Sequence, residues 1–210
     1  MRPHSHIRHL SSLAILACAG LLTAAEPTPQ PIPSAPILTP AAPATPRVNG
    51  PGIFGVRPGA PFLYSIPATG QRPMTFAVDG LPAGLTLDAA TGRITGSLAT
   101  AGEHTVTLRA KNALGESAKK FRIVVGDRIA LTPPMGWSSW NCWGDAVSQE
   151  LVLSSARAMA EKGLRDHGWT YINIDDCWQG KRDPKTGEIT SNEKFPDMEE
   201  IGRASCRERV

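Results

Sequence analysis

The alternation of apolar and polar positions predicts a β-sheet domain over residues 48–127. Short runs of period two are separated by turn signals, among them Asp79-Gly80, Thr91-Gly92 and 112–115. In the clearest run, His104–Lys111, apolar and polar side chains fall on opposite faces. About six or seven such strands in one domain are typical of an immunoglobulin-like (Ig-like) sandwich. The side chains expected in its interior are Phe62, Tyr64, Ile66, Met74, Phe76, Val78, Val106, Leu108, Ala110, Phe121, Ile123 and Val125.

The pattern changes after Asp127 to strand, helix, strand. Ser148 is a suitable N-cap for a helix over Leu151–Lys162, and Gly163 ends it. The run Trp169–Ile174 is nearly all apolar, as expected of a strand in a parallel sheet that is covered on both faces. Two parallel strands joined by a helix require a crossover connection, which we expect to be right-handed. A second helix should begin at Phe195–Glu199.

Three other segments are assigned from composition. Residues 1–25 have the basic start, apolar stretch and small-residue cleavage site of a secretory signal peptide, with lipoprotein processing at Cys18 as an alternative. Residues 26–47 contain eight prolines and predict an extended linker. Residues 201–210 have no helical apolar face and resemble translated sequencing adapter, so we expect a non-native tail there. The signal peptide predicts an exported protein, whether periplasmic, cell-surface or secreted.

Candidate chemistry begins at Met135–Gly144, which contains three of the five tryptophans. Indole rings suit stacking on sugar rings, although core packing is an equally simple reading. Asp175 and Asp176 follow the second strand, at the end where α/β barrels bind their ligands. Because side chains alternate along a strand, both carboxylates can face the same side only if the chain curls into its loop there. The pair could bind sugar hydroxyls, hold a metal or be a solvated loop pair; no histidine or third acid lies nearby for a metal.

Two resemblances sharpen this picture. Gly80–Ser117 resembles Ig-like or cadherin-like modules of bacterial extracellular proteins, which implies a spacer or a sugar-binding module. MGWSSWN, YINIDDCWQ (Tyr171–Gln179) and NEKFPDM (Asn192–Met198) resemble the opening of glycoside hydrolase family 27, the α-galactosidase family. The second resemblance covers about Ile129–Glu199.

The family resemblance implies a fold, a reaction and site residues. It implies that 128–200 is the start of a (β/α)8 TIM barrel, with two βα units present, and a retaining hydrolase that removes terminal α-linked galactose. Related activities on α-N-acetylgalactosamine or β-L-arabinopyranose, or a non-enzymatic glycan-binding surface protein, are alternatives. Carried over, the substrate-binding residues are Trp140, Asp175 and Asp176, while the nucleophile and the acid/base lie on later strands. The chain as written should therefore be inactive.

The cysteines depart from the pattern of the family. Many members pair the cysteine after the aspartates with one beyond the first tryptophan motif, which would correspond to Cys142 and Cys177. Cys142 is closer to Trp140 than that pattern places it, so two free thiols are the alternative.

The positive net charge comes from the two ends of the chain. The formal net charge is +3, but residues 1–25 and 201–210 contribute +2 each and leave −1 for the rest. The basic balance therefore does not indicate nucleic-acid binding. We expect α-galactoside glycans as partners, and no metal, nucleotide or flavin cofactor; no apolar run reaches the length of a membrane span.

Overall fold

The structure, a computed structural model, describes residues 41–207, with side chains up to Gly202. The predicted signal peptide, Cys18, most of the predicted linker and the last three residues of the predicted tail lie outside the described residues. The chain from Ala41 onward forms one compact unit. Within the part that the structure describes, no helix is both long and apolar enough to cross a membrane.

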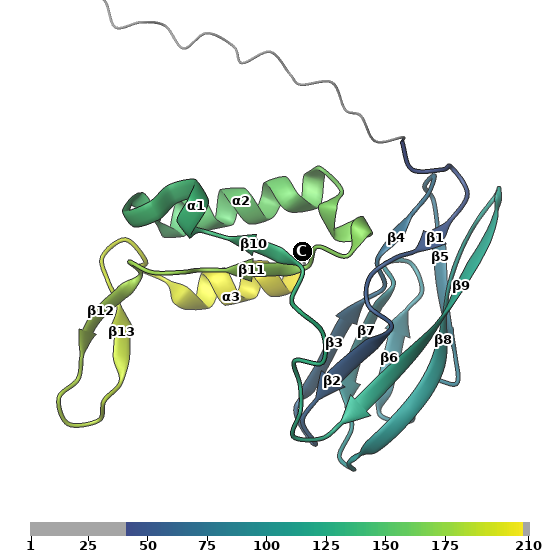
Figure 1. The fold of residues 1–210 in the computed structure, drawn as a ribbon, viewed down its shortest axis with the longest axis horizontal. Helices are drawn as coiled ribbons and strands as arrows, with labels where there is room; N and C mark the ends of the chain where they lie inside the picture. The colour runs from purple at the N-terminus through teal and green to yellow at the C-terminus, as the bar shows by residue number, and fades with distance from the viewer. Residues whose placement is uncertain (1–40, 208–210) are drawn as a thin grey trace, which may run out of the picture. The chain divides into compact units, whose positions relative to one another are not determined.

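Residues 47–125 form a two-layer β-sandwich (Figure 1). One sheet has the strand order β2–β9–β8–β5 and the other β3–β7–β6; β2 runs parallel to β9, and the other pairs of the two sheets are antiparallel. A short pair, β1 with β4, lies apart from these two sheets. The strands are β1 (Arg47–Val48), β2 (Ile53–Val56), β3 (Pro61–Ser65), β4 (Ala68–Thr69), β5 (Thr75–Asp79), β6 (Leu85–Asp88), β7 (Arg93–Ser97), β8 (Gly102–Asn112) and β9 (Gly115–Val125).

The core of the sandwich confirms the alternation read from the sequence. All the predicted interior side chains are buried except Val78, which is partly buried and packs against the same cluster. Leu108, Ala110, Phe121 and Ile123 are fully buried. The predicted turns also form, since β5 ends at Asp79, and β8 and β9 meet at 112–115.

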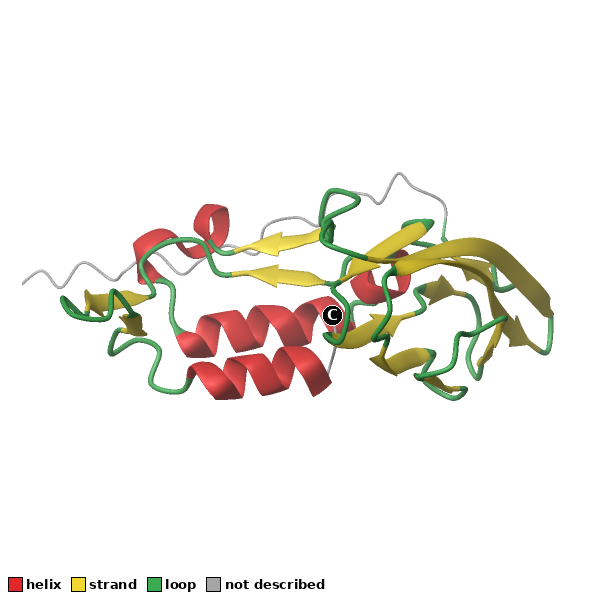
Figure 2. Cartoon of the chain, turned by 90° about the horizontal axis from the view of Figure 1, so that it is seen from below, coloured by secondary structure: helices red, strands yellow, loops and turns green. Residues whose placement is uncertain are grey.

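The second region is a parallel β-α-β unit followed by a hairpin and a helix. β10 (Gly136–Ser138) pairs in parallel with β11 (Tyr171–Asn173). Between and after them lie α1 (Trp140–Trp143), η1 (Gly144–Ala146), α2 (Gln149–Glu161), η2 (Leu164–His167), β12 (Gln179–Arg182), β13 (Ile189–Ser191) and α3 (Met198–Arg207). Figure 2 shows α2 and α3 side by side on one face of the β10–β11 pair.

Apolar packing explains why the helices take that face. Trp137 from β10 and Ile172 from β11 pack against Ala156 and Met159 of α2. A neighbouring cluster joins α2 to α3 through Val152, Leu153, Phe195 and Ile201. The opposite face of the strands is uncovered, and Tyr171 is 49% exposed there.

The segment that begins at Ile201, in which no helical apolar face was found, continues α3 to Arg207. Asp197 accepts the Glu200 N–H at 2.7 Å through Oδ1, as a helix N-cap does. Ile201 is 8% exposed and packs with Met198 against α2, which supplies the apolar contact that the sequence analysis did not find. The strand expected over Trp169–Ile174 is also shorter, at Tyr171–Asn173.

Candidate substrate-binding site

The two parallel strands end in a small polar network. Ser138 of β10 lies opposite Asn173 of β11, and Asp175 follows two residues later on the same face. The Ser138 hydroxyl donates to Asp175 Oδ2 at 3.2 Å and accepts from Asn173 Nδ2 at 3.2 Å. All three side chains are exposed. Ser138 thus holds one carboxylate oxygen of Asp175. Ser138, Asn173 and Asp175 lie on the strand face opposite to α2 and α3.

Ser139 fixes the backbone beneath this network. It is fully buried, and its hydroxyl accepts the Asp175 N–H at 2.9 Å. Its own N–H donates to the Asn173 carbonyl at 3.1 Å, so the parallel pairing continues one residue beyond β10. Its carbonyl accepts the Trp143 N–H at 2.8 Å and begins α1. A single buried serine therefore links the first tryptophan motif to the aspartate motif.

The chain leaves the strand direction at Asp176 and Cys177. Cys177 has a positive φ of 66°, the left-handed conformation that non-glycine residues seldom adopt. Asp176 Oδ1 accepts the Cys177 N–H at 2.7 Å, and Asn192 Nδ2 donates to the Cys177 carbonyl at 2.8 Å. Two adjacent carboxylates can face the same side only where the chain departs from strand geometry. That departure begins directly after Asp175. Asp176 is exposed as well.

The three tryptophans of the first motif divide between core and surface. Trp137 packs against α2, and Trp143 joins the cluster between α2 and α3 while its Nε1 donates to Ser155 Oγ at 3.2 Å. Trp140 is 47% exposed at the start of α1, next to Ser139. Core packing therefore accounts for two of these rings, and only Trp140 remains available for a ligand.

Cys142 and Cys177 are free in the structure, with Cys142 exposed and Cys177 half-buried. The structure thus contains the free-thiol alternative and not the Cys142–Cys177 bond. Among the described residues, no group of three His, Cys, Asp or Glu side chains could hold a metal ion.

Sequence reasoning missed Ser138, Ser139 and Asn173. Asn173 lies in phase with Asp175 on a strand, so alternation alone could have placed it on the same face. The two serines stand in the first motif, 35 or more residues away in sequence from their partners. Only the pairing of β10 with β11 brings them to the aspartates.

Comparisons with known proteins agree with this division of the chain. Residues 44–126 match the family described as "Putative Ig domain", and residues 132–202 match the family described as "Alpha galactosidase A". The chain is 46% identical over 81 residues to alpha-galactosidase A of Cellvibrio japonicus and 44% identical over 69 residues to a probable alpha-galactosidase of Dictyostelium discoideum. These alignments cover 38% and 33% of this chain but 19% and 18% of those proteins.

Two crystal structures from Bacteroides fragilis, titled as a "putative alpha-galactosidase" and a "putative alpha-galactosidase/melibiase", superpose with TM-scores of 0.75 and 0.74 at 43% and 41% identity. They cover 83% and 80% of this chain, and the chain spans 38% and 36% of theirs. This chain thus spans less than a fifth of the two curated relatives and less than two fifths of the two structures. Residues 132–202 thus match the α-galactosidase family, glycoside hydrolase family 27, and follow residues that match an Ig-like domain in the same chain.

Proposed function

We propose that this chain is part of an exported, retaining glycoside hydrolase that removes terminal α-linked galactose from oligo- or polysaccharides. The single observation that carries the proposal is the polar network at the ends of β10 and β11. It holds Asp175 in place and is followed at once by the exposed carboxylate of Asp176. The homology of residues 132–202 to α-galactosidases supports the glycoside hydrolase class.

The residues suit recognition of a sugar. Two carboxylates accept hydrogen bonds from neighbouring hydroxyls, and hydrogen bonds to a charged acceptor are about twice as strong as neutral ones. The bond from Ser138 leaves the remaining acceptor positions of Asp175 for ligand hydroxyls. Trp140 offers an exposed apolar ring on which the C–H face of a pyranose can stack. We assign substrate binding to Trp140, Asp175 and Asp176.

The uncovered face of β10 and β11 supports a larger catalytic domain. Parallel sheets are almost always covered on both faces, yet α2 and α3 cover only one face here. Tyr171, Asn173 and Ser138 are exposed on the other. We infer that further strands close a (β/α)8 barrel over this face, and that the nucleophile and the acid/base lie on those strands. The 210-residue chain alone should then be inactive.

The proposal is tested on the product of the complete gene, with 4-nitrophenyl α-D-galactopyranoside as substrate. Asp175→Asn and Asp176→Asn should each raise KM and lower kcat/KM by about 10- to 100-fold, since a hydrogen bond to a charged group contributes about 1.5–3 kcal/mol. Asp127→Asn, an exposed aspartate between the two regions, is the matched control and should leave both constants unchanged.

Three results would contradict the proposal at different points. Unchanged kinetics in both variants would show that the pair is a solvated loop. Lack of hydrolysis by the complete product, together with lack of two aspartates at later strand ends, would favour the non-enzymatic glycan-binding protein. Release of 4-nitrophenol by the purified 210-residue chain would refute its predicted inactivity.

A further inference from the structure

The Ig-like domain contacts the segment that leads into β11. Asn49 Nδ2 donates to the Asp166 carbonyl at 2.8 Å and to Thr69 Oγ1 at 3.2 Å. Arg72 Nη2 lies 3.1 Å from Asp166 Oδ2 in a partly exposed ion pair. Asp166 is thus held by its backbone and by its side chain, from two different parts of the sandwich.

Two glycines let the backbones meet at this contact. A Cβ on Gly168 would lie 3.0 Å from Gly50 Cα, closer than nearly all ordinary Cβ contacts. Gly168 has φ +99° and Gly50 has φ +73°, so both take the left-handed conformation that glycine adopts without strain. Lys119 Nζ donates to the Gly50 carbonyl and anchors this loop to β9. A side chain at Gly168 would have to push Gly50 away by a few tenths of an ångström, and a Cβ at Gly50 would lie 2.7 Å from Pro67 Cγ.

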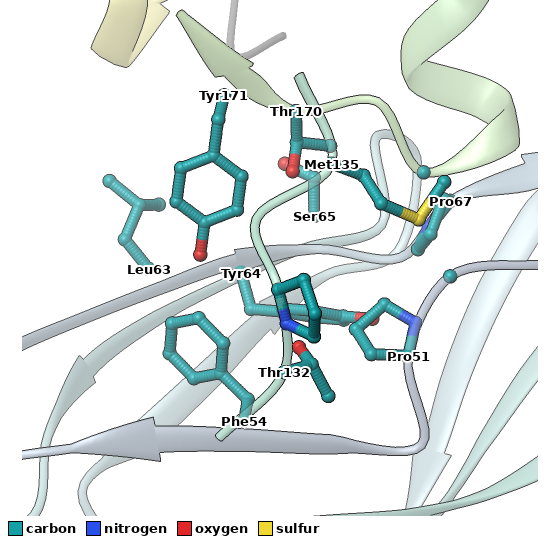
Figure 3. A pocket seen from close by; sticks show the side chains of 13 residues that line it. Pro51, Phe54, Leu63, Tyr64, Ser65, Pro67, Thr132, Met135, Thr170 and Tyr171 are labelled. Carbon is teal, nitrogen blue, oxygen red and sulfur yellow. The ribbon is translucent and has the colours of Figure 1, made fainter. Parts of the chain in front are cut away.

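A largely apolar cavity of about 540 Å³ lies beside this contact (Figure 3). Phe54, Leu63 and Tyr64 line it from the sandwich, and Pro133, Met135 and Tyr171 line it from the strand starts. None of its lining residues is charged. Tyr64 Oη is buried there without a hydrogen-bond partner, and burial raises the pKa of this phenol well above its usual range. This oxygen has almost no solvent-accessible surface, so it does not face the open space of the cavity.

The contact and the cavity lie at the N-terminal ends of the two parallel strands. Met135 directly precedes β10, Thr170 directly precedes β11, and Tyr171 begins β11. The candidate substrate site lies beyond Ser138 and Asn173, at the opposite ends of the same strands. The sandwich therefore lies away from the end at which Asp175 and Asp176 would bind a sugar.

We propose that the Ig-like domain packs rigidly against the N-terminal end of the catalytic barrel. The cavity is then filled by the N-terminal ends of the later barrel strands. This inference rests on the barrel of the proposed function. Gly50 and Gly168 of the contact also line the cavity. One superposition onto each longer Bacteroides fragilis chain covers 80% or more of this chain, which is more than either domain alone. The sandwich is then neither a detachable glycan-binding module nor a flexible spacer.

The first test measures thermal unfolding of the 210-residue chain by calorimetry. Asn tolerates the left-handed conformation, so Gly163→Asn, at a glycine with φ +75° and no neighbour within 4 Å, should shift Tm by about 1 °C or less. Gly168→Asn forces a side chain against Gly50 and should lower Tm by roughly 5 °C more than its control. Equal shifts of Tm in the two variants would contradict a rigid contact between Gly50 and Gly168.

The second test compares Tyr171→Ala in the 210-residue chain and in the complete gene product. Tyr171 is 49% exposed in the short chain, so the loss of Tm should be small there, about 3 °C or less. It should be at least twice as large in the complete product, where later strands cover the ring. An equally small loss of Tm in both proteins would show that the cavity stays empty and would overturn the proposed packing of the Ig-like domain against the barrel.

Activity separates this inference from the proposed function. Deletion of residues 41–127 from the complete product should abolish soluble, active enzyme. A deleted protein that keeps its kcat/KM on the nitrophenyl substrate and loses only activity on polymeric galactomannan would instead identify a glycan-binding module. If the intact product hydrolyses no α-galactoside, the proposed function fails, while both thermal tests still decide the role of the sandwich.

Discussion

Gly136→Ala should break the pairing on which the candidate site depends. Gly136 is the second residue of the first tryptophan motif and lies opposite Tyr171 in the register of β10 and β11. A Cβ at this position would lie 2.1 Å from the Tyr171 carbonyl oxygen and 2.6 Å from its Cβ. Both obstacles belong to or adjoin the backbone, so no side-chain rotation relieves the clash.

The magnitude follows from the separation that the strands would need. Ordinary contact begins near 3.4 Å, so the strands must separate by at least 1.3 Å. Met135 O accepts from Thr170 N at 2.9 Å and Tyr171 N at 3.2 Å, and Asn173 O accepts from Ser139 N at 3.1 Å. Separation on this scale breaks these bonds. At about 1 kcal/mol each, the loss is about 3 kcal/mol, or a fall in Tm of roughly 6–12 °C.

Tryptophan fluorescence is the assay, because all five tryptophans lie between residues 137 and 178 and report on the β-α-β region alone. Gly126→Ala is the control, since a Cβ there meets nothing within 4 Å. A Gly136→Ala melting curve within 1 °C of the control would refute the register of β10 with β11, and with it the placement of Ser138 beside Asp175.

Two further predictions concern the sandwich. Phe121→Ala removes a fully buried ring whose centroid lies 4.6 Å from that of the Tyr64 ring, and should lower the free energy of unfolding by about 3–5 kcal/mol. Urea unfolding followed by circular dichroism measures this loss. A loss below about 1 kcal/mol would contradict the packing. Hydrogen bonds from Thr91 and from the N–H of Ala90 hold the pKa of Asp88 below its usual value, so the stabilisation by its charge is complete above about pH 4 and is lost as pH falls through the lowered pKa. The difference in Tm between the wild-type chain and Asp88→Asn should therefore be constant from pH 7 to 5 and shrink at lower pH, and a difference that grows on acidification would contradict this assignment.

The sandwich could be predicted because its information is local. Each strand carries its own alternation, and glycine or asparagine marks the turns, so Val106, Leu108 and Ala110 could be assigned to the core without knowledge of their neighbours. The β-α-β order could also be predicted, because the start of the helix has a local signal. Ser148 caps α2 as expected, and its Oγ accepts the Leu151 N–H at 3.3 Å.

Features that depend on distant partners could not be predicted. The hairpin of β12 and β13 is formed by mostly polar and mostly exposed residues that carry no clear alternation. The helical course of α3 depends on burial of Ile201 against α2, which the local sequence does not reveal. The contact between Asn49 and Asp166 joins residues 117 positions apart. In the candidate site, the aspartates were found from their place after a strand, but the serines that hold Asp175 required the pairing of two strands.

The most direct test of the account is a crystal structure of the complete gene product with D-galactose bound. We expect a galactose whose hydroxyls lie within hydrogen-bond distance of the Asp175 and Asp176 carboxylates, with Trp140 against the ring. Galactose bound elsewhere, with both carboxylates in contact only with solvent, would contradict it.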